Sequence, residues 1–584
     1  MIATLHKQWL PWQRFLGLFG SRGFRPSPTI NTFQIKDFRE YCKIYCLLDS
    51  IHLSEVWENF IQMGLDIYGL DANYCCSAPG FFWQCFLYST KTKLEYITED
   101  KKSMIDMITG GIRGGPCYTT NRWITANTER HPQTYDPTKE RTQILYLDQN
   151  SLYAHAMLNK LPQSNFQYVP VDELRKIDWT DPDIGNDGIG YILTVALKYP
   201  ESIMDLTSDI PLAPENRIVQ TSELSPQQIH LINMHHHNMK TITTTPRLLL
   251  TCYDKDKYTV HYKTLQYYLS MGMELTKIYE GISFVEKAYI KDYILANLER
   301  RRKAKSKTQK DFIKLSNNII YGKCLQQVKN RIQVKICTSK AEAEHYISLP
   351  NFKSFKQLSP NLSIIILVPK KVLFDKPIYS GFAILEFSKL IYYTGYYQQL
   401  KKIFGARISC AYLDTDSAVT KIRDPDNTFY SDLVKNKQYF DFSKIPEDHE
   451  IFKLYSHIPD LRTFNSGISG IWKIESLDIL EVISLRCKNY SIKYFNSKEE
   501  QKCTGIPKHS LVNCKHDFYR SVLQNNLLGR VEVRLIRSVN HKLCIILVNK
   551  IGFHTIDVKR VYPFPNNPIN SLPLGHYMLR YMNM

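Results

Sequence analysis

The sequence lacks the features of several common protein classes. No two of its 14 cysteines stand in a C-x2-C pair, although a zinc module needs ligands at about this spacing. Scattered cysteines of this kind are typical of a reduced, intracellular protein. The chain also has no run of about 18 apolar residues, and no repeats or low-complexity tracts. We therefore expect neither a zinc module nor a membrane-spanning segment.

Acidic residues are missing from residues 1–36, which carry Arg14, Arg22 and Arg25. This composition is typical of a mitochondrial transit segment, of a disordered leader or of the replaced start of a truncated gene. In the whole chain, 75 Lys and Arg face 56 Asp and Glu, a net charge of +19. A chain of 584 residues can form several domains. Its positive charge fits a polyanionic partner.

Two carboxylates, Asp414 and Asp416, stand one residue apart in an apolar stretch. The flanking residues 411–413 and 418–419 are typical of a strand. Because strand side chains alternate between faces, this pattern predicts that both carboxylates point the same way. Like charges side by side need a cation between them, and oxygen ligands suit Mg²⁺. A D-x-D pair on a solvated turn is the alternative.

A third carboxylate, Asp148, follows the strand-like run 144–147 and precedes a turn with Leu152 and Tyr153. Alone, this pattern is also typical of a helix N-cap followed by a core tyrosine.

A further motif lies between these two, at residues 314–322. Lys314, Asn318 and Tyr321 are spaced i, i+4 and i+7, which places them on one face of a helix. Gly322 follows as the expected end of that helix. A basic, an amide and an aromatic side chain on one face suit a triphosphate and a base pair better than a core.

In this order, the three motifs resemble those of family B DNA polymerases: D-x-x-S-L-Y, K-x3-N-S-x-Y-G and D-T-D. The similarity extends to the protein-primed branch, which includes polymerases of Polinton/Maverick elements and adintovirus-like viruses. The stretches that share it are residues 111–115, 211–215, 376–385 and 488–490.

The resemblance implies an active site with two Mg²⁺ ions, with Mn²⁺ as the alternative. The expected catalytic residues are Asp148, Asp414 and Asp416, and the expected metal ligands are Asp148, Asp416 and the carbonyl of Gln149. The expected nucleotide-binding residues are Ser151, Leu152, Tyr153, Arg301, Lys314, Asn318 and Tyr321. The expected DNA-binding residues are Arg113, Gly114, Gly115, Gly322, Lys488 and Tyr490.

The resemblance also implies the fold class, an α+β multidomain protein with the right-hand polymerase fold of palm, fingers and thumb. A truncated remnant of a ribonuclease H-like exonuclease domain is expected before it. The expected units are a basic leader (1–36), the exonuclease remnant (37–105), a template-binding connector (106–142), the first part of the palm with an insertion (143–240), an insertion leading to the fingers (241–289), the fingers (290–323), a second insertion (324–375), the second part of the palm (376–480), and the palm end with the thumb (481–584).

The exonuclease remnant rests on Tyr45 and Asp49, which resemble the third exonuclease motif, Y-x3-D. Asp37 is the first acidic residue of the chain, so the two earlier acidic motifs have no place. We therefore expect primer extension without proofreading.

The function implied is template-directed DNA synthesis in replication of a mobile element or virus, with a DNA template-primer and deoxynucleoside triphosphates as partners. A terminal priming protein is a further expected partner, implied only by the resemblance to protein-primed polymerases. We expect the nucleus or a viral replication site as its location, with the mitochondrion as an alternative. Three other functions stay open: a catalytically silent DNA-binding relic, a non-enzymatic nucleic-acid binder, and a reverse transcriptase or RNA polymerase.

Overall fold

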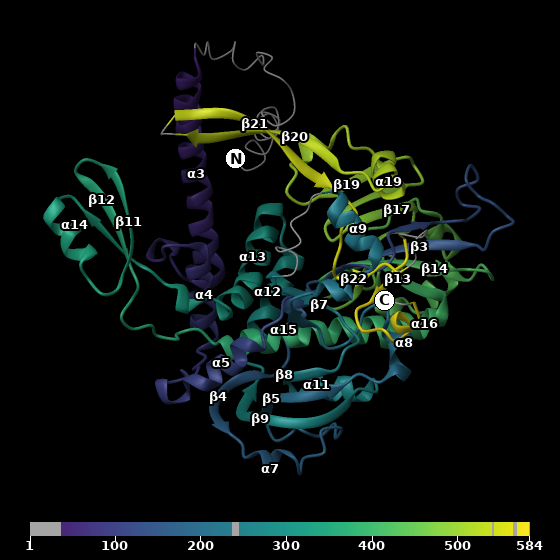
Figure 1. Ribbon diagram of the computed structural model, residues 1–584, viewed down its shortest axis with the longest axis horizontal. Helices are drawn as coiled ribbons and strands as arrows, with labels where there is room; N and C mark the ends of the chain where they lie inside the picture. Colours follow the sequence, from purple (N-terminus) through teal and green to yellow (C-terminus); the bar gives the residue numbers. More distant parts are fainter. Residues whose placement is uncertain (1–36, 236–243, 540–541, 564–568, 583–584) are drawn as a thin grey trace.

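A computed structural model describes residues 37–235, 244–539, 542–563 and 569–582 (Figure 1). The expectations for the leader at residues 1–36 lie outside these ranges. The molecule combines several sheets with long helices, which agrees with the expected α+β multidomain class. Within the described ranges, no helix is both long enough and apolar enough to cross a membrane.

The largest sheet has six strands in the order β1-β13-β14-β3-β16-β15. Its neighbours come from distant parts of the sequence: β3 pairs with β14 on one side and β16 on the other, both antiparallel. The strands are β1 (Cys117–Thr119), β3 (Thr142–Gln149), β13 (Ile408–Asp414), β14 (Ser417–Arg423), β15 (Phe440–Asp441) and β16 (Trp472–Ser476).

One long helix packs against this sheet, as the apolar run after residue 382 predicts. It comprises α15 (Ile378–Tyr393), a π-helical segment (Thr394–Leu400) and α16 (Lys401–Phe404). Its aromatic side chains share a buried core with Leu145 and Leu413 of the sheet.

A second core gathers side chains of several helices, from residues 68–86, 290–324 and α15. Residues 290–323, where the fingers are expected, form two helices, α12 (Lys291–Lys303) and α13 (Lys307–Cys324). The prediction that Gly322 ends the second helix is wrong, because α13 continues to Cys324. The remaining helices of this region are α3 (Phe38–Tyr68), α4 (Ala78–Thr90) and α5 (Lys102–Gly110).

The region between Asp148 and α12 forms a separate four-stranded sheet, β4-β9-β5-β8. Its helices are short, as its many prolines predict. The strands are β4 (Leu161–Tyr168), β5 (Ile189–Lys198), β8 (Lys255–His261) and β9 (Glu274–Lys287). The helices are α6 (Leu152–Ala156), α7 (Val171–Leu174), α8 (Met204–Thr207), α9 (Pro226–Met234) and α11 (Tyr262–Ser270), and a small ribbon joins β6 (Glu215–Arg217) to β7 (Arg247–Leu249).

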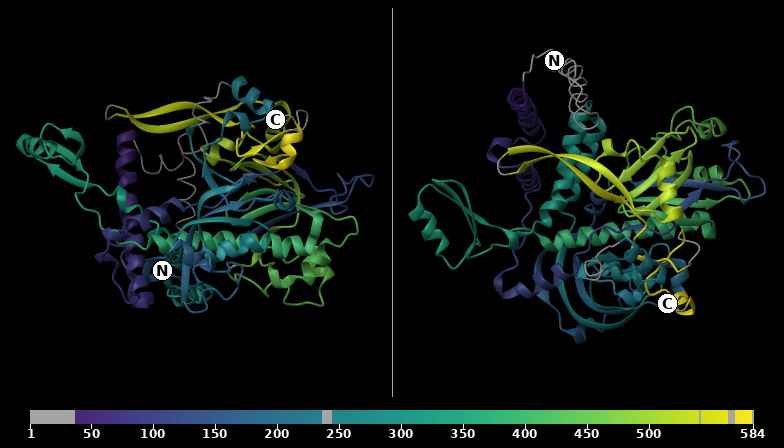
Figure 2. Two further views of the ribbon diagram at one scale, coloured as in Figure 1. Left: turned by 60° about the horizontal axis from the view of Figure 1, so that its bottom comes forward. Right: turned by 45° about the horizontal axis from the view of Figure 1, so that its top comes forward.

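Two parts project from the body of the molecule (Figure 2). The first is a three-stranded sheet with one helix: β10 (Gln333–Cys337), α14 (Lys340–Ile347), β11 (Phe352–Ser359) and β12 (Leu362–Leu367). The second is the long ribbon of β20 (Gly529–Val539) and β21 (Lys542–Phe553).

The ribbon grows from a four-stranded sheet, β19-β18-β17-β2, which α19 covers. The elements of this sheet are β2 (Trp123–Thr125), β17 (Ile479–Arg486), β18 (Asn489–Tyr494), β19 (Glu499–Cys503) and α19 (His516–Asn525). Two further helices, α17 (Phe429–Lys435) and α18 (Glu450–Leu454), lie near β15. Near the C-terminus, β22 (Arg560–Val561) pairs with β23 (Leu572–Pro573).

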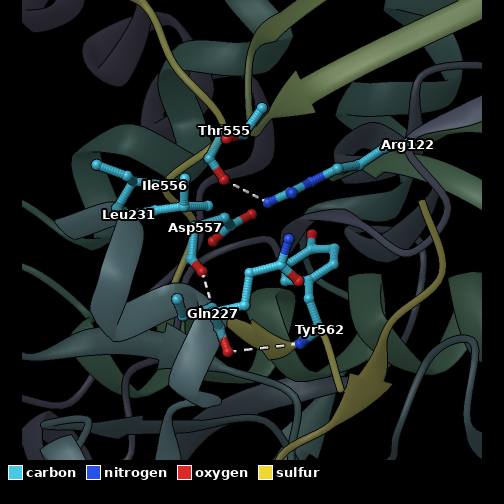
Figure 3. A pocket seen from close by; sticks show the side chains of 8 residues that line it. Arg122, Gln227, Leu231, Thr555, Ile556, Asp557 and Tyr562 are labelled. Carbon is cyan, nitrogen blue, oxygen red and sulfur yellow. Dashed lines mark hydrogen bonds between the residues drawn. The ribbon is translucent and has the colours of Figure 1, made fainter. Parts of the chain in front are cut away.

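After the ribbon, the chain returns to the large sheet and is held there by a buried arginine. The Arg122 guanidinium donates to the Thr555 carbonyl at 2.5 Å and lies over the Tyr562 ring, 3.5 Å from its centre (Figure 3). These contacts fix the C-terminal segment beside α9 and β2.

Candidate active site

Three aspartates meet at one end of the large sheet. Asp148 is the penultimate residue of β3, Asp414 ends β13, and Asp416 lies in the turn before β14. Asp148 pairs with Ser417 in the register of β3 and β14, and the Gln149 N–H donates to the Asp416 carbonyl at 2.7 Å. The strand pairing therefore brings motifs together that are far apart in the sequence.

The turn between β13 and β14 differs from the expected strand. The Asp416 N–H donates to the Asp414 carbonyl at 2.8 Å, and Thr415 between them has a φ of 66°. This is a γ-turn with a positive central φ, a strained conformation for a β-branched residue. The prediction that strand alternation aligns the two carboxylates is wrong, because Asp416 lies in this turn.

A glycine permits the close packing that supports the turn. The Thr415 N–H donates to the Pro116 carbonyl at 2.8 Å. A Cβ on Gly115 would lie 2.5 Å from the Thr415 methyl group, so only glycine fits without movement. Gly115 was expected to approach DNA, and the structure shows it against the carboxylate turn; Gly114 is exposed.

Burial and mutual repulsion raise the pKa values of two of the three carboxyls. The pKa of Asp148 rises to about 7, first through burial and then through the charges of Asp416 and Glu475. The pKa of Asp416 is also raised, by burial and by the charge of Asp414. Adjacent buried carboxylates of this kind favour a bound cation.

The donor set fits Mg²⁺ completed by substrate. Within the described residues, no group of three or more His, Cys, Asp or Glu side chains could hold a metal ion by itself. Mg²⁺ is usually bound through one or two carboxylates together with substrate phosphates. Asp148 and Asp416 fit this requirement.

Asp414 is neutralised by a lysine from the neighbouring sheet. The Lys488 ammonium contacts both Asp414 carboxylate oxygens, at 2.6 and 2.7 Å. Lys488 lies in the turn between β17 and β18 with a φ of 58°, and its N–H donates to the Tyr412 hydroxyl at 3.1 Å. Lys488 therefore lies in a turn that separates two strands.

Tyr490 has a packing role in the structure. Only 7% of its surface is exposed, and its ring lies 5.0 Å from that of Tyr412. The expectation that Tyr490 contacts DNA is corrected accordingly, because its ring is enclosed in the core between the two sheets.

The predicted polar face of α13 is confirmed. Lys314 and Asn318 are exposed, whereas the opposite face, with Phe312 and Ile320, is buried. The charge of Lys314 lowers the pKa of Asp416, which indicates that this face looks toward the carboxylates. Gly322 is also exposed and has open space beside it.

Two tyrosines connect α6 with α13. The Tyr153 and Tyr321 rings stack with centroids 4.6 Å apart and an interplanar angle of 22°. Ser151, with a φ of 50°, starts α6, and Leu152 is buried. The first turn of a helix leaves its N–H groups without intrahelical partners, so they are available to an anion.

Arg301 lies in a basic run at the end of α12. Two of its neighbours, Arg302 and Lys303, form ion pairs with Glu299, and the Arg300 guanidinium donates to Asn297 at 3.0 Å. Arg301 is half-buried and takes part in none of the ion pairs formed by described residues.

Arg113 is not available to a template strand, contrary to expectation. Only 6% of its surface is exposed, and its guanidinium donates to the Thr259 carbonyl at 2.8 Å. It also lies over the Tyr258 ring, 3.7 Å from its centre. Arg113 therefore links the loop that contains Gly114 and Gly115 to β8.

We expect Arg113→Leu to act on stability and leave template affinity unchanged. The change removes a stacked cation and leaves carbonyl groups without donors, at a cost of about 2–4 kcal/mol in the free energy of unfolding. Urea unfolding measures this, with the exposed Arg175→Leu as a control within about 0.5 kcal/mol. Weaker template binding by a fully folded Arg113→Leu protein would contradict the assignment.

Asp148 is bordered by charged residues that the sequence did not point to. Lys473 lies directly opposite Asp148 in the register of β3 and β16. Glu475 forms ion pairs with Lys473, at 3.6 Å, and with Lys444. Glu475 raises the pKa of Asp148, and both lysines lower it. The K-x-E pattern after Trp472 was the one signal in the sequence, and nothing local links it to Asp148.

We expect the metal-free protein to lose stability through Asp148 as pH rises. The carboxyl has a pKa of about 7 when folded against an ordinary 3.8. The stability that this raised pKa gives to the folded protein is fully present below the ordinary pKa of 3.8, where the carboxyl is protonated in both the folded and the unfolded protein. This stability is lost as pH rises through the folded pKa of about 7. Asp416 acts in the same direction.

Unfolding free energies of the wild type and Asp148→Asn, measured without divalent ions from about pH 4 to pH 8, test this linkage. The difference should move in favour of Asp148→Asn as pH rises. A difference independent of pH, or equal to that of the exposed Asp426→Asn, would contradict it.

The residues of the expected exonuclease motif lie on one helix, α3. Tyr45 stacks on Tyr41 with ring centroids 5.9 Å apart, and Asp49 is exposed. Asp49 is therefore a helix-surface residue; the exonuclease remnant itself stays a prediction.

The family model for DNA polymerase type B, organellar and viral, matches residues 31–357. The matched region includes the Asp148 motif and α13. The chain therefore belongs to this family of DNA polymerases, in agreement with the resemblance of its motifs and with the expected right-hand fold class.

Solved structures that match this chain include Phi29 DNA polymerase. Its ternary complex with primer-template DNA and incoming nucleotide is 13% identical, with a TM-score of 0.44, and the match covers 82% of this chain and 68% of that one. Its binary complex with primer-template DNA gives 15% identity, a TM-score of 0.45, and 82% and 67% coverage. Comparison with curated proteins gives no match.

Proposed function

We propose that this chain is a template-directed DNA polymerase that adds deoxynucleotides to a primer 3′-hydroxyl. The observation that supports this proposal most strongly is the placement of Asp148, near the end of β3, beside Asp416 in the turn before β14, where the charge of Lys314 acts on Asp416. Family membership supports the same conclusion. A basic DNA-binding surface alone would not require repelling carboxylates.

Asp148, Asp416 and the Gln149 carbonyl would hold the divalent metal. Two Mg²⁺ ions in such a site would lower the pKa of the primer hydroxyl and stabilise charge on the transferred phosphoryl group. Asp148 and Asp416 supply the negative charge that retains the ions. Asp414 has a different role in this proposal: it positions Lys488, which would contact the primer terminus.

The residues of α6 and α13 would bind the nucleotide. Lys314 would neutralise the triphosphate, and the free N–H groups at the start of α6 would bind its terminal oxygens. Tyr153, held flat by Tyr321, would lie beneath the sugar and exclude a 2′-hydroxyl. Asn318 and Arg301 would line the remaining sides of the nucleotide.

Primer extension by the purified chain tests the proposal directly. The assay uses a primed DNA template, four deoxynucleoside triphosphates and Mg²⁺, with Mn²⁺ in parallel. Extension that stops at the template end supports the proposal; DNA binding without extension would instead indicate a silent relic. A second assay that starts from deoxynucleotide transfer onto a protein hydroxyl would test protein priming.

A further inference from the structure

The turn that carries Lys488 also carries a cysteine in contact with a second cysteine. Cys487 directly precedes Lys488, and its thiol donates to the Cys117 carbonyl at 2.8 Å. The two thiols also affect one another, since Cys487 lowers the pKa of Cys117 and Cys117 raises the pKa of Cys487. Both are free in the structure. Residues from β1 and from the turn after β17 are thus in direct contact through sulfur.

The surroundings of Cys117 distinguish it from the other buried thiols. Hydrogen bonding from Cys487, and then from the Tyr412 hydroxyl, lowers the pKa of Cys117, and the charge of Lys559 acts in the same direction. In contrast, burial raises the pKa values of Cys85 and Cys324 to about 12. Because the thiolate is the reactive form, Cys117 is the better nucleophile.

The two thiols also differ in their access to solvent. Cys117 is 8% exposed, whereas Cys487 is only half-buried. The pKa of Cys487 is raised well above its ordinary value, first through Cys117, so a peroxide oxidises Cys117 as the thiolate, and Cys487 is placed to resolve the oxidised sulfur. This is the arrangement of an attacked and a resolving cysteine.

We propose that Cys117 and Cys487 form a reversible disulfide when the protein meets a peroxide, and that this bond disturbs the adjacent Lys488–Asp414 pair. In the first step, the Cys117 thiolate attacks hydrogen peroxide and takes one oxygen, and the displaced hydroxide takes up the proton that Cys117 had lost, which gives a sulfenic acid and one water. The Cys487 sulfur then attacks the Cys117 sulfur and displaces hydroxide, which takes up the Cys487 proton and forms the second water. Two thiols and one peroxide thus give one disulfide and two waters.

The expected disturbance follows from the contacts that the bond would replace. Cys117 pairs with Asp414 in the register of β1 and β13. The Cys487 sulfur would leave the Cys117 carbonyl, and the Cys117 sulfur would leave the Tyr412 hydroxyl, 3.5 Å away. That hydroxyl also accepts the Lys488 N–H, so the turn and its ammonium would move relative to Asp414. The effect on DNA synthesis rests on the proposed function, whereas formation of the disulfide does not.

The test treats the full chain with hydrogen peroxide, blocks the remaining thiols and maps linked peptides by mass spectrometry. Primer extension is followed in parallel, before and after addition of dithiothreitol. Cys487→Ser removes the resolving thiol at a half-buried position, and Cys76→Ser, at an exposed cysteine, is the matched control.

We expect a Cys117–Cys487 peptide, a fall in extension of about tenfold, and recovery with dithiothreitol. Cys487→Ser should keep its activity in peroxide, and Cys76→Ser should behave as the wild type. Absence of the linked peptide while exposed cysteines are oxidised would overturn the proposal. A linked peptide with unchanged primer extension would contradict the proposed effect of the disulfide on the active site. A chain inactive before treatment would count against the proposed polymerase function alone, since peptide mapping would still report the disulfide.

Discussion

Asp416→Ala is expected to reduce single-nucleotide incorporation by about a thousandfold or more while template affinity stays unchanged. Loss of a metal-binding carboxylate removes several kcal/mol of transition-state stabilisation, and about 1.4 kcal/mol corresponds to tenfold in rate. Because Asp416 and Asp148 repel each other, which raises the pKa of Asp148, Asp148→Ala should have an effect of the same order.

Two further variants make this test specific. Asp426→Ala changes an exposed aspartate in the loop after β14 and should retain full activity. Asp414→Asn should lose less activity than Asp416→Ala, because Asp414 is bound to Lys488. Single-turnover incorporation rates, with DNA affinity measured without divalent ions, separate these outcomes. Incorporation by Asp416→Ala within about tenfold of the wild type would overturn the assignment of the metal site.

Tyr153→Ala is expected to raise the use of ribonucleotides relative to deoxynucleotides by about a hundredfold. This is the discrimination that an apolar pocket reaches against one added hydroxyl. The Tyr153 ring is held in place by its stack on Tyr321, so it presents a fixed surface to the sugar. Removal of the ring would open the space beneath C2′.

The matched control for this prediction is Tyr153→Phe, which keeps the ring and should keep the discrimination. Tyr321→Ala removes only the supporting ring and should give an intermediate loss. The measured quantity is the ratio of kcat/KM for a deoxynucleotide and its ribonucleotide on one primed template. An unchanged ratio in Tyr153→Ala would show that another group selects the sugar.

Motif order in the sequence predicted the parts of the site that depend on local pattern. The i, i+4, i+7 spacing of Lys314, Asn318 and Tyr321 identified the exposed face of α13, because helix geometry fixes that face. The family is confirmed as well. The individual roles of these residues remain predictions for experiment.

The errors arose where tertiary contacts override local pattern. The resemblance implied that Arg113 binds DNA, yet Thr259 and Tyr258 from a distant strand enclose it. The residues on both sides of Asp414 and Asp416 predicted a strand, but Gly115 and Pro116 support a γ-turn at Thr415. No local signal in the sequence reveals either partner.

The strand order of the large sheet has a consequence for synthesis of the protein on the ribosome. The central strand β3 can pair only after β14 and β16 have been synthesised, and both are encoded far downstream. Asp414 likewise gains its partner Lys488 only after β17 has left the ribosome. A nascent chain that ends before these strands exposes both edges of an apolar strand, and such edges promote aggregation. We therefore expect β3 to be the segment of the growing chain that most needs protection by chaperones.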